Sequence, residues 1–336
     1  MGRSYAAYLS SLLLFGSNGI VAAMIALPSL DIVVARTFLG ALLLGTLFFG
    51  ASLVVRHAKP RCGTACNPAS SATARQNATA IALLACSGAA LGASWIVLFE
   101  AYRLVGVGTA SLMYYCGPVI VMAVAPLLFK ERLGIKKIAG FGAVALGAVL
   151  VSVQALEGGQ DPQGLALGAA SAIAYAVMIV CSKKATAMCP AAADRGLRNS
   201  FIQLLAGFAA AAAYSALTQG PNALLVPAAP ADIAPLLMLG LINTGIGCFL
   251  YFSSIGRLPV QTVAVCGYLE PLSAVVLATL ILGEPMSAVQ LAGAVLIVGG
   301  AAFCELSGSQ ASASLKLPAL SKPMRTIASS PKPTIR

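Results

Sequence analysis

Long apolar runs, separated by short polar segments, fill the chain from its start to about residue 305. Each run approaches the roughly 20 residues that a helix needs to cross a bilayer, and the alternating strands of a membrane β-barrel are not found. The pattern predicts an all-α membrane protein with ten transmembrane helices: Ala6–Leu27, Ile32–Val55, Ala78–Leu104, Val107–Phe129, Ile135–Ala155, Leu165–Cys181, Ser200–Leu217, Ile233–Ile255, Val260–Leu282 and Ala288–Cys304.

The polar segments divide these helices into two groups of five. The turn from Glu157 to Pro162 separates the groups, and a Ser-, Pro- and Lys-rich stretch follows the last helix. We therefore predict a first five-helix repeat over residues 5–155 and a second over residues 163–305. Residues 306–336 are predicted to form a disordered, basic, cytoplasmic tail.

The two groups are related by an internal duplication. When Gly92 is placed on Gly245, the chain aligns with itself without a gap, and matched pairs include Thr109/Thr262, Tyr115/Tyr268, Pro118/Pro271, Glu131/Glu284, Gly140/Gly293 and Gly147/Gly300. Because each half has an odd number of spans, the second half crosses the membrane in the opposite sense. Two inverted five-helix repeats are typical of alternating-access carriers, whose solute site lies near the midplane where the halves meet.

The charge distribution tests this topology independently. A net charge of +11 in a soluble protein would suggest a nucleic-acid partner, but only 9% of this chain is charged and 59% is hydrophobic. Cytoplasmic loops of membrane proteins collect Lys and Arg, and with the N-terminus inside, nearly all of the 21 basic residues fall on the cytoplasmic side. The exceptions are Arg36 and Arg103. We therefore expect both termini in the cytoplasm, a lipid bilayer as the surroundings, and no nucleic acid.

The nine cysteines do not indicate a metal centre. Most of them lie in or beside apolar spans, where cysteine behaves as a small hydrophobic residue. Cys62 and Cys66 lie near His57, the one histidine, and these are too few ligands at too loose a spacing for a metal site. We expect no metal and no cofactor.

The fourth helix of each half has the form Thr-x5-Tyr-x2-Pro followed by a terminal Glu. With Arg36 opening the second helix as Ala-Arg-Thr-Phe-Leu, residues 5–305 resemble the EamA-type permeases of the drug/metabolite transporter superfamily. Phe15-Gly16 departs from the Trp-Gly of many relatives. The resemblance implies export or exchange of amino acids, related metabolites or toxic organic compounds without nucleotide hydrolysis. It implies a cavity lined by the third, fourth, eighth and ninth helices, with contributions from the first and sixth. We expect a multi-pass protein of a bacterial plasma membrane, as a monomer or homodimer.

Glu270 is the strongest candidate for a coupling residue. It lies near the middle of the ninth span, where an ionised carboxylate costs about 2.5–3.5 kcal/mol, and intramembrane ionisable groups are functional by default. We predict that it exchanges a proton for the solute; the alternative is a structural carboxyl, neutral or paired with another helix. The predicted substrate-binding residues are Asn18, Trp95, Tyr114, Tyr115, Asn243, Tyr268 and Glu270, for which ordinary packing is the alternative.

Other positions have structural interpretations. Pro118 and Pro271 each remove a helical N–H and are predicted hinges. Glu131 and Glu284 are expected to be structural corners that accept N–H bonds from the following helix, at Lys136 or Ala288. Glu100 and Arg103 are expected to pair, either structurally or as an outer gate, whereas Arg36 either points outward or anchors to another helix. The paired glycines of the fifth and tenth spans predict close helix contacts.

The function predicted from these residues is that of a secondary-active carrier for a small organic solute, without enzymatic activity. The sequence has no phosphate-binding loop of the kind that an ATP-driven pump needs, and it has too few catalytic groups for a membrane enzyme. It also has no filter-like loop of the kind that a channel needs. A lipid flippase or passive facilitator of the same fold remains the alternative, since it needs the same helices without Glu270.

Overall fold

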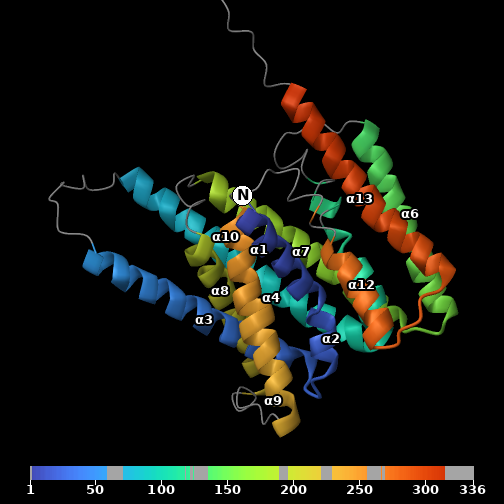
Figure 1. Cartoon of the computed structure of the whole chain (residues 1–336), viewed down its shortest axis with the longest axis horizontal. Coiled ribbons are helices and arrows are strands. Elements are labelled where there is room, and N and C mark those ends of the chain that lie inside the picture. The colour runs from blue at the N-terminus through green and yellow to red at the C-terminus, as the bar shows by residue number, and fades with distance from the viewer. Residues whose placement is uncertain are drawn as a thin grey trace, which may run out of the picture.

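The computed structural model describes residues 2–58, 71–117, 119–121, 124, 135–188, 196–220, 229–255, 266 and 269–314. Within these ranges the secondary structure is entirely helical, and Figure 1 shows the helices gathered into one bundle. The elements are α1 (Gly2–Gly16), α2 (Asn18–Ala23), α3 (Ser29–Ala58), α4 (Ser71–Tyr114), α6 (Ile135–Glu157), α7 (Pro162–Met188), α8 (Gly196–Gln219), α9 (Pro230–Leu237), η3 (Met238–Ile246), α10 (Gly247–Ile255), α12 (Leu269–Ile281) and α13 (Ala288–Ser314).

Seven helices in the described residues are long and apolar enough to cross a membrane. One of them extends from Gln76 to Val121, and two shorter apolar helices, Leu269–Ile281 and Ala288–Phe303, accompany the seven. The protein is therefore a multi-pass membrane protein with a helical fold. The full set of ten spans stays a prediction.

The longest helix is interrupted where the sequence predicts a boundary between two spans. Gly106 in α4 has φ 75° and ψ 162°, a backbone conformation that is open mainly to glycine. The break lies between Leu104 and Val107, the predicted ends of the third and fourth spans. Two helices therefore meet at Gly106, with the second starting at Val107.

Two more predicted spans contain irregular backbone. The first is divided at Ser17 into α1 and α2. The eighth is built from α9, η3 and α10, and η3 is a nine-residue π-helix. Short π-helical segments are rare and occur often at functional sites because they redirect side chains. The sequence pattern contains no signal for this one.

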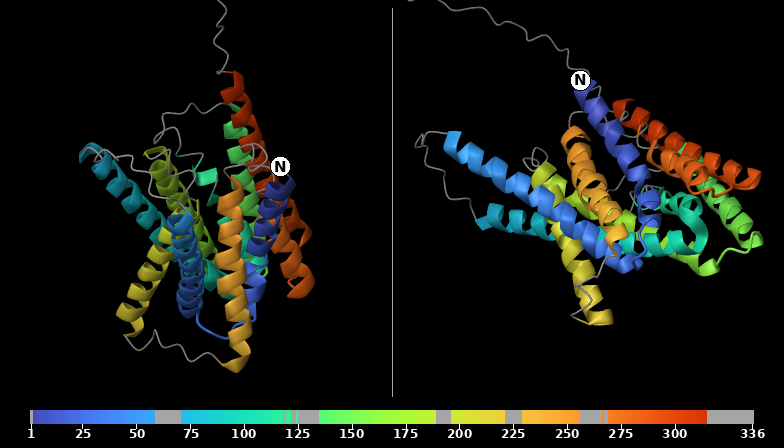
Figure 2. Two further views of the ribbon diagram at one scale, coloured as in Figure 1. Left: turned by 60° about the vertical axis from the view of Figure 1, so that its left-hand side comes forward. Right: turned by 60° about the horizontal axis from the view of Figure 1, so that its bottom comes forward.

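Helices α6 and α13 pack side by side at one edge of the bundle, as both Figure 1 and Figure 2 show. A Cβ built on Gly147 would lie 2.6 Å from the carbonyl oxygen of Gly293, and one on Gly300 would lie 2.9 Å from that of Gly140. These backbones are too close for any side chain at the crossing. The glycine contact predicted between the fifth and tenth spans is confirmed, and the two helices are antiparallel.

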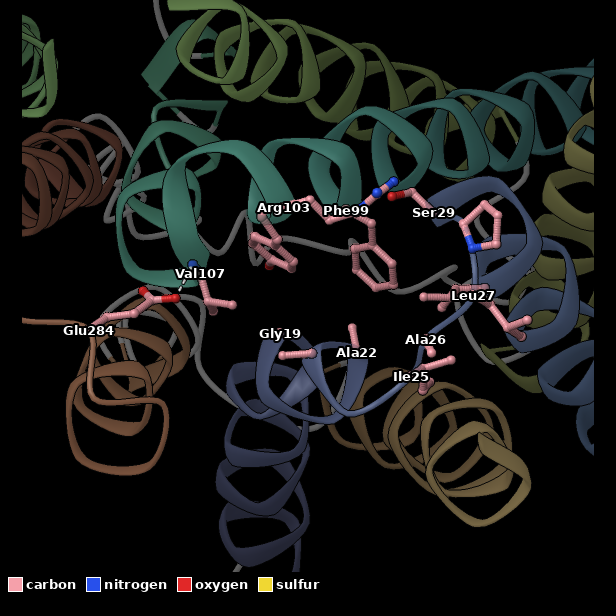
Figure 3. A pocket seen from close by; sticks show the side chains of 14 residues that line it. Gly19, Ala22, Ile25, Ala26, Leu27, Ser29, Phe99, Arg103, Val107 and Glu284 are labelled. Carbon is pink, nitrogen blue, oxygen red and sulfur yellow. Dashed lines mark hydrogen bonds between the residues drawn. The ribbon is translucent and has the colours of Figure 1, made fainter. Parts of the chain in front are cut away.

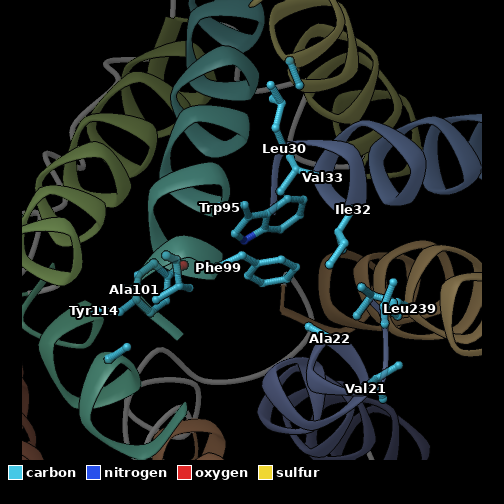
Figure 4. Close-up of a cluster of buried hydrophobic side chains, with 14 of the residues drawn as sticks. Val21, Ala22, Leu30, Ile32, Val33, Trp95, Phe99, Ala101, Tyr114 and Leu239 are labelled. Atoms are coloured by element: carbon cyan, nitrogen blue, oxygen red, sulfur yellow. The ribbon is translucent and has the colours of Figure 1, made fainter. Parts of the chain in front are cut away.

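Helix α4 packs against α7 and α8, and also against α2, α3 and α12. Helices α7 and α8 cover α4, where Gly88 and Gly92 approach the backbone of Gln203 and Gly207. On the other side, α1 and α3 pack against α10 and η3. The largest buried apolar cluster lies between these layers, and Figure 4 shows Trp95 and Phe99 of α4 close to Val33 of α3.

Glu284 joins segments that are far apart in the sequence. Its carboxylate accepts the backbone N–H groups of Val107 at 2.8 Å and Gly108 at 2.9 Å, the first residues after the Gly106 break. An acidic side chain at this position satisfies otherwise free N–H groups and is favoured by the helix dipole. The expected structural role fits this arrangement, but the expected partner, Ala288, is wrong.

Glu284 does not cap α13 because Ser287 and Gln290 already form the cap of that helix. Ser287 Oγ accepts the N–H of Gln290 at 3.1 Å, and Gln290 Oε1 accepts the N–H of Ser287 at 2.9 Å. This reciprocal capping box satisfies the N–H groups of Ser287 and Gln290 without a contribution from Glu284.

The predicted pairing of Glu100 with Arg103 is confirmed. Arg103 Nη1 lies 3.3 Å from Glu100 Oε2, and both side chains are partly exposed. Ser29 Oγ also donates to the same carboxylate oxygen at 2.7 Å, so this group ties α3 to α4. An exposed ion pair of this kind contributes about 0–1 kcal/mol.

Several predictions fall outside the described residues. Pro118, Tyr268 and Glu131 are among them, so their hinge, binding and corner roles stay predictions. Pro271 is buried in the first turn of α12, where a missing N–H costs nothing. A hinge there stays a prediction, because residues 256–265, 267 and 268 are not described.

Candidate functional site

A fully buried arginine lies at the centre of the bundle. Arg36, on α3, has 0% of its surface exposed. Its Nε donates to Thr244 Oγ1 of η3 at 3.0 Å, and its Nη2 makes a long contact of 3.5 Å with Asn18 Oδ1 of α2. The outward orientation that the sequence allowed is not adopted, and the side chain anchors instead to α2 and η3.

Aromatic rings from α4 cover this guanidinium. Its central carbon lies 4.0 Å from the centre of the Trp95 ring and 5.0 Å from that of Phe99. Cation–π contacts in a dry environment are each worth about 2 kcal/mol or more, the indole being the strongest acceptor. They offset part of the several kcal/mol that burial of an ion costs, without neutralising its charge.

Thr244 and Asn243 position the far side of this cluster. Thr244 Oγ1 donates to the carbonyl oxygen of Leu239, a spacing of five residues that reflects the π-helical turn. Asn243 is fully buried, and its Nδ2 donates to the carbonyl oxygen of Leu14 at 2.8 Å and to Ser17 Oγ at 2.9 Å. These bonds fasten η3 to the Ser17 break between α1 and α2.

Glu270 lies among tyrosines in the first turn of α12. Its carboxyl lies beside the hydroxyl of Tyr115 and within electrostatic range of Tyr102 and Tyr114. Tyr114 in turn packs on Tyr115 and Tyr175, with ring centres 5.2 and 4.8 Å apart. The carboxyl therefore stands in an aromatic environment with few polar partners.

The α1–α12 contact beside Glu270 depends on a glycine. A Cβ on Gly16 would lie 2.9 Å from the carbonyl oxygen of Glu270, so the backbones approach directly. The neighbouring Phe15 ring packs against Gly247, where a Cβ would lie 2.7 Å from it. Phe15-Gly16 thus brings α1 close to both α10 and α12.

A hollow of about 470 Å³ lies between α2 and α4 and is called here the α2–α4 hollow. Figure 3 shows Gly19 and Ala22 on one side, Phe99 and Arg103 on the other, and Glu284 bonded to Val107 at its end. Phe99 also contacts Arg36, and its ring stacks on that of Tyr102 with centres 5.4 Å apart. This stacked pair therefore stands between the hollow and the arginine.

A second hollow of about 490 Å³ lies on the other side of Glu284, between α4 and α6. It is lined by Thr109, Gln154, Thr279 and Gln290, among others. Glu284 lines both hollows, so its bonds to Val107 and Gly108 form the partition between them.

Most described members of the predicted site lie in this region. Asn18 and Trp95 contact Arg36, Asn243 adjoins Thr244, and Tyr114 and Tyr115 adjoin Glu270. Sequence reasoning assigned Arg36 only a structural role and did not select Thr244, Tyr102 or Phe99. The available signal was that Arg36 lies several residues inside a predicted span, whereas the other basic residues lie at span ends or in loops.

Comparison with known proteins agrees with this architecture. Residues 3–153 and 162–305 match the EamA-like transporter family. The chain belongs to the EamA-like transporter family. The matched segments include every helix that contributes to the cluster around Arg36.

Two relatives of this EamA-like transporter carry transporter names. The "Uncharacterized transporter YxxF" of Bacillus subtilis (strain 168) is 24% identical over 87% of this chain and 86% of its own length. The "Probable amino-acid metabolite efflux pump" of Salmonella typhimurium (strain LT2) is 31% identical over 57% of this chain and 65% of its own length. The names describe transport rather than catalysis.

A crystal structure of a protein that is 20% identical in sequence has the same fold. It matches with a TM-score of 0.55 over 91% of this chain and 98% of that chain. The EamA-like transporter is thus a membrane-embedded, small-molecule transporter by family and a helical bundle by structure.

Proposed function

We propose that this EamA-like transporter is a secondary-active carrier that exports or exchanges small, amino-acid-like metabolites by alternating access, with both termini in the cytoplasm. The solute binds between Arg36, Glu270 and the aromatic residues around them. Residues 5–155 and 163–305 form two inverted five-helix repeats that move against each other around this site. The 31% identical relative whose name refers to amino-acid metabolites supports this choice of solute class.

The pattern of helix packing supports the inverted repeats. In the internal alignment that places Gly92 on Gly245, Gly147 matches Gly300 and Gly293 matches Gly140. If each residue is replaced by its match, the Gly147–Gly293 contact becomes the Gly300–Gly140 contact, which is also present. In the same exchange, packing of α4 on α7 and α8 becomes packing of η3 and α10 on α1 and α3, which is again observed. A two-fold axis in the membrane plane has this consequence.

The observation that carries the proposal is the polar cluster around Arg36. Asn18, Arg36 and Trp95 come from the first half, whereas Asn243 and Thr244 come from the second. The cluster lies where helices are irregular, at the Ser17 break and the π-helix η3. Carriers place their sites at such interruptions because free backbone groups and buried polar side chains replace the water around a solute.

Glu270 is proposed as the coupling residue. Its carboxyl lies beside the Tyr115 hydroxyl and near Tyr114, and it has no ion-pair partner among the described residues. A carboxyl in this setting gains or loses a proton as the cavity opens to one side or the other. Competition between proton and solute then links export to the proton gradient.

The experiment begins with identification of the solute. Metabolites in the medium of cells that express the wild-type chain are compared with those in the medium of cells that express Glu270→Gln. Purified protein is then reconstituted in proteoliposomes, and each compound that is enriched only with the wild type is tested as a solute. We expect exchange of unlabelled for labelled solute, with no movement of a fluorescent phospholipid between leaflets. Lipid movement without solute exchange would contradict the carrier and support a flippase.

A further inference from the structure

We propose that Arg36 is the binding group for a carboxylate on the transported solute and that Asn243 receives an N–H group of the same molecule. This inference rests on the proposed carrier function and specifies the chemistry of its site. The two side chains belong to opposite halves of the protein, on α3 and η3.

The first argument is the unused hydrogen-bonding capacity of Arg36. Its Nε is bonded to Thr244 and its Nη2 reaches Asn18 only at 3.5 Å, while Nη1 is buried and has no partner among the described residues. A guanidinium presents its two terminal nitrogens as a planar fork that fits both oxygens of a carboxylate. The partners already present hold Nε and one side of Nη2, so the fork is preorganised and its Nη1 has no partner among the described residues.

The second argument is charge. Every recorded neighbour of Arg36 is neutral, and in the part of the chain that the structure describes no carboxylate lies within ion-pair distance of it. The carboxyl of Glu270 lies beside the hydroxyl of Tyr115 instead. A buried cation without a counter-ion is stabilised when a ligand supplies one.

The third argument identifies the rest of the solute. Asn243 Oδ1 is also buried and lacks a donor among the described residues. Its orientation is fixed, because the amide nitrogen donates to the carbonyl oxygen of Leu14, which can only accept. Asn243 adjoins Thr244, which holds Arg36, so a donor and an acceptor that both lack partners among the described residues, Arg36 Nη1 and Asn243 Oδ1, lie in one cluster.

These two unsatisfied groups fit a zwitterion. The carboxylate would bind Arg36, and an ammonium or amide N–H would bind Asn243 Oδ1, with the aromatic rings of Trp95 and Phe99 against the apolar part. A dianionic phosphate fits less well, because Arg36 is the one cation recorded in this cluster. The geometry points to an α-amino acid or a close derivative.

The test first varies the solute and keeps the protein unchanged. Wild-type proteoliposomes are offered L-leucine, L-phenylalanine and L-cysteine, the carboxamide of each, and the corresponding acid without its amino group. We expect the amino acid to compete for exchange at least about tenfold better than its carboxamide, the effect of losing a hydrogen bond to a charged group. The acid without an amino group should fall between the two.

The protein is then varied. Arg36→Gln should remove the difference between amino acid and carboxamide, and Arg36→Lys should retain part of it, because a lysine keeps the charge without the fork. Asn243→Leu should reduce preference for the amino acid over its deaminated form. Lys183→Gln, which removes one exposed charge near the end of α7, is the matched control and should leave each ratio unchanged.

Each outcome decides a different claim. Equal transport of amino acids and carboxamides by the wild type, or an unaltered ratio in folded Arg36→Gln protein, would overturn the role of Arg36 and leave the carrier in place. Because the solute series needs no variant, poor folding of Arg36→Gln does not affect that result. If the wild type moves none of these compounds and none from the secretion comparison, both the carrier and this inference are contradicted.

Discussion

Glu284 caps the helix that begins at Val107, through hydrogen bonds of 2.8 Å to Val107 N–H and 2.9 Å to Gly108 N–H. The contact connects the two halves of the chain and separates the α2–α4 hollow from the hollow on its other side. A group that fastens one half to the other at this end of the bundle should stabilise one conformation of a carrier over the other.

Replacement of Glu284 by Gln should weaken this closure. The amide keeps one acceptor but loses the charge, at a cost of about 1.5–3 kcal/mol for bonds to a charged group. In a chain that retains only Cys248, which is buried beside Arg36, a membrane-impermeant maleimide should label the cysteine at least about tenfold faster from outside. Glu157→Gln, at the exposed end of α6, is the control.

Unchanged labelling of Cys248 in the Glu284 variant would mean that the Val107 contact is structural only. Faster labelling in Glu157→Gln as well would indicate general loosening instead of opening at this contact.

The duplication predicts a matching contact at the opposite face. Glu131 occupies the position of Glu284 in the first half, and Val260 and Gln261 occupy those of Val107 and Gly108. We expect Glu131→Gln to accelerate labelling of Cys248 from the cytoplasmic side, measured in inside-out vesicles. Acceleration from outside only would contradict the inverted relation of the halves.

The glycine crossing of α6 and α13 gives a stability test. Gly147→Ala places a methyl group 2.6 Å from the carbonyl oxygen of Gly293, so the helices must separate. Overpacking of this kind costs about 1–3 kcal/mol and should lower the melting temperature of the protein in detergent. Gly142→Ala on the same helix meets nothing within 4 Å and should leave the melting temperature unchanged or slightly higher. Equal effects of the two substitutions would contradict the packing.

The packing of α4 on α7 can be tested with native cysteines. Cys86 Sγ and Cys181 Sγ lie 3.8 Å apart, so a small adjustment permits a disulfide. With every other cysteine replaced, mild oxidation should form an intramolecular disulfide that mass spectrometry detects and reductant reverses. A chain that retains Cys181 alone controls for links between molecules. Failure to form the bond under conditions that link exposed thiols would place α4 and α7 apart.

The sequence predicts much of this fold because a bilayer imposes strong requirements on length and polarity. Apolar runs mark the helices, and Gly106 lies between two of them, where its positive φ is a conformation that glycine adopts readily. The glycines of α6 and α13 were predictable since close backbone contact in a membrane favours small residues.

What was not predicted depends on contacts between distant segments. Hydropathy does not indicate that Arg36 points inward, because its partners Thr244 and Asn18 come from other helices. The contact of Glu284 with Val107 needed the same three-dimensional information. The π-helical turn that presents Thr244 has an ordinary apolar sequence, so its irregularity follows from packing.

The most direct test of the proposed carrier is solute accumulation driven by a proton gradient in proteoliposomes. For the solute identified by secretion, we expect wild-type protein to accumulate it, and Glu270→Gln to lose this accumulation while it still exchanges labelled for unlabelled solute. Glu157→Gln should behave as the wild type. Full gradient-driven accumulation by Glu270→Gln would contradict coupling at this carboxyl, and absence of both accumulation and exchange in the wild type would contradict the carrier itself.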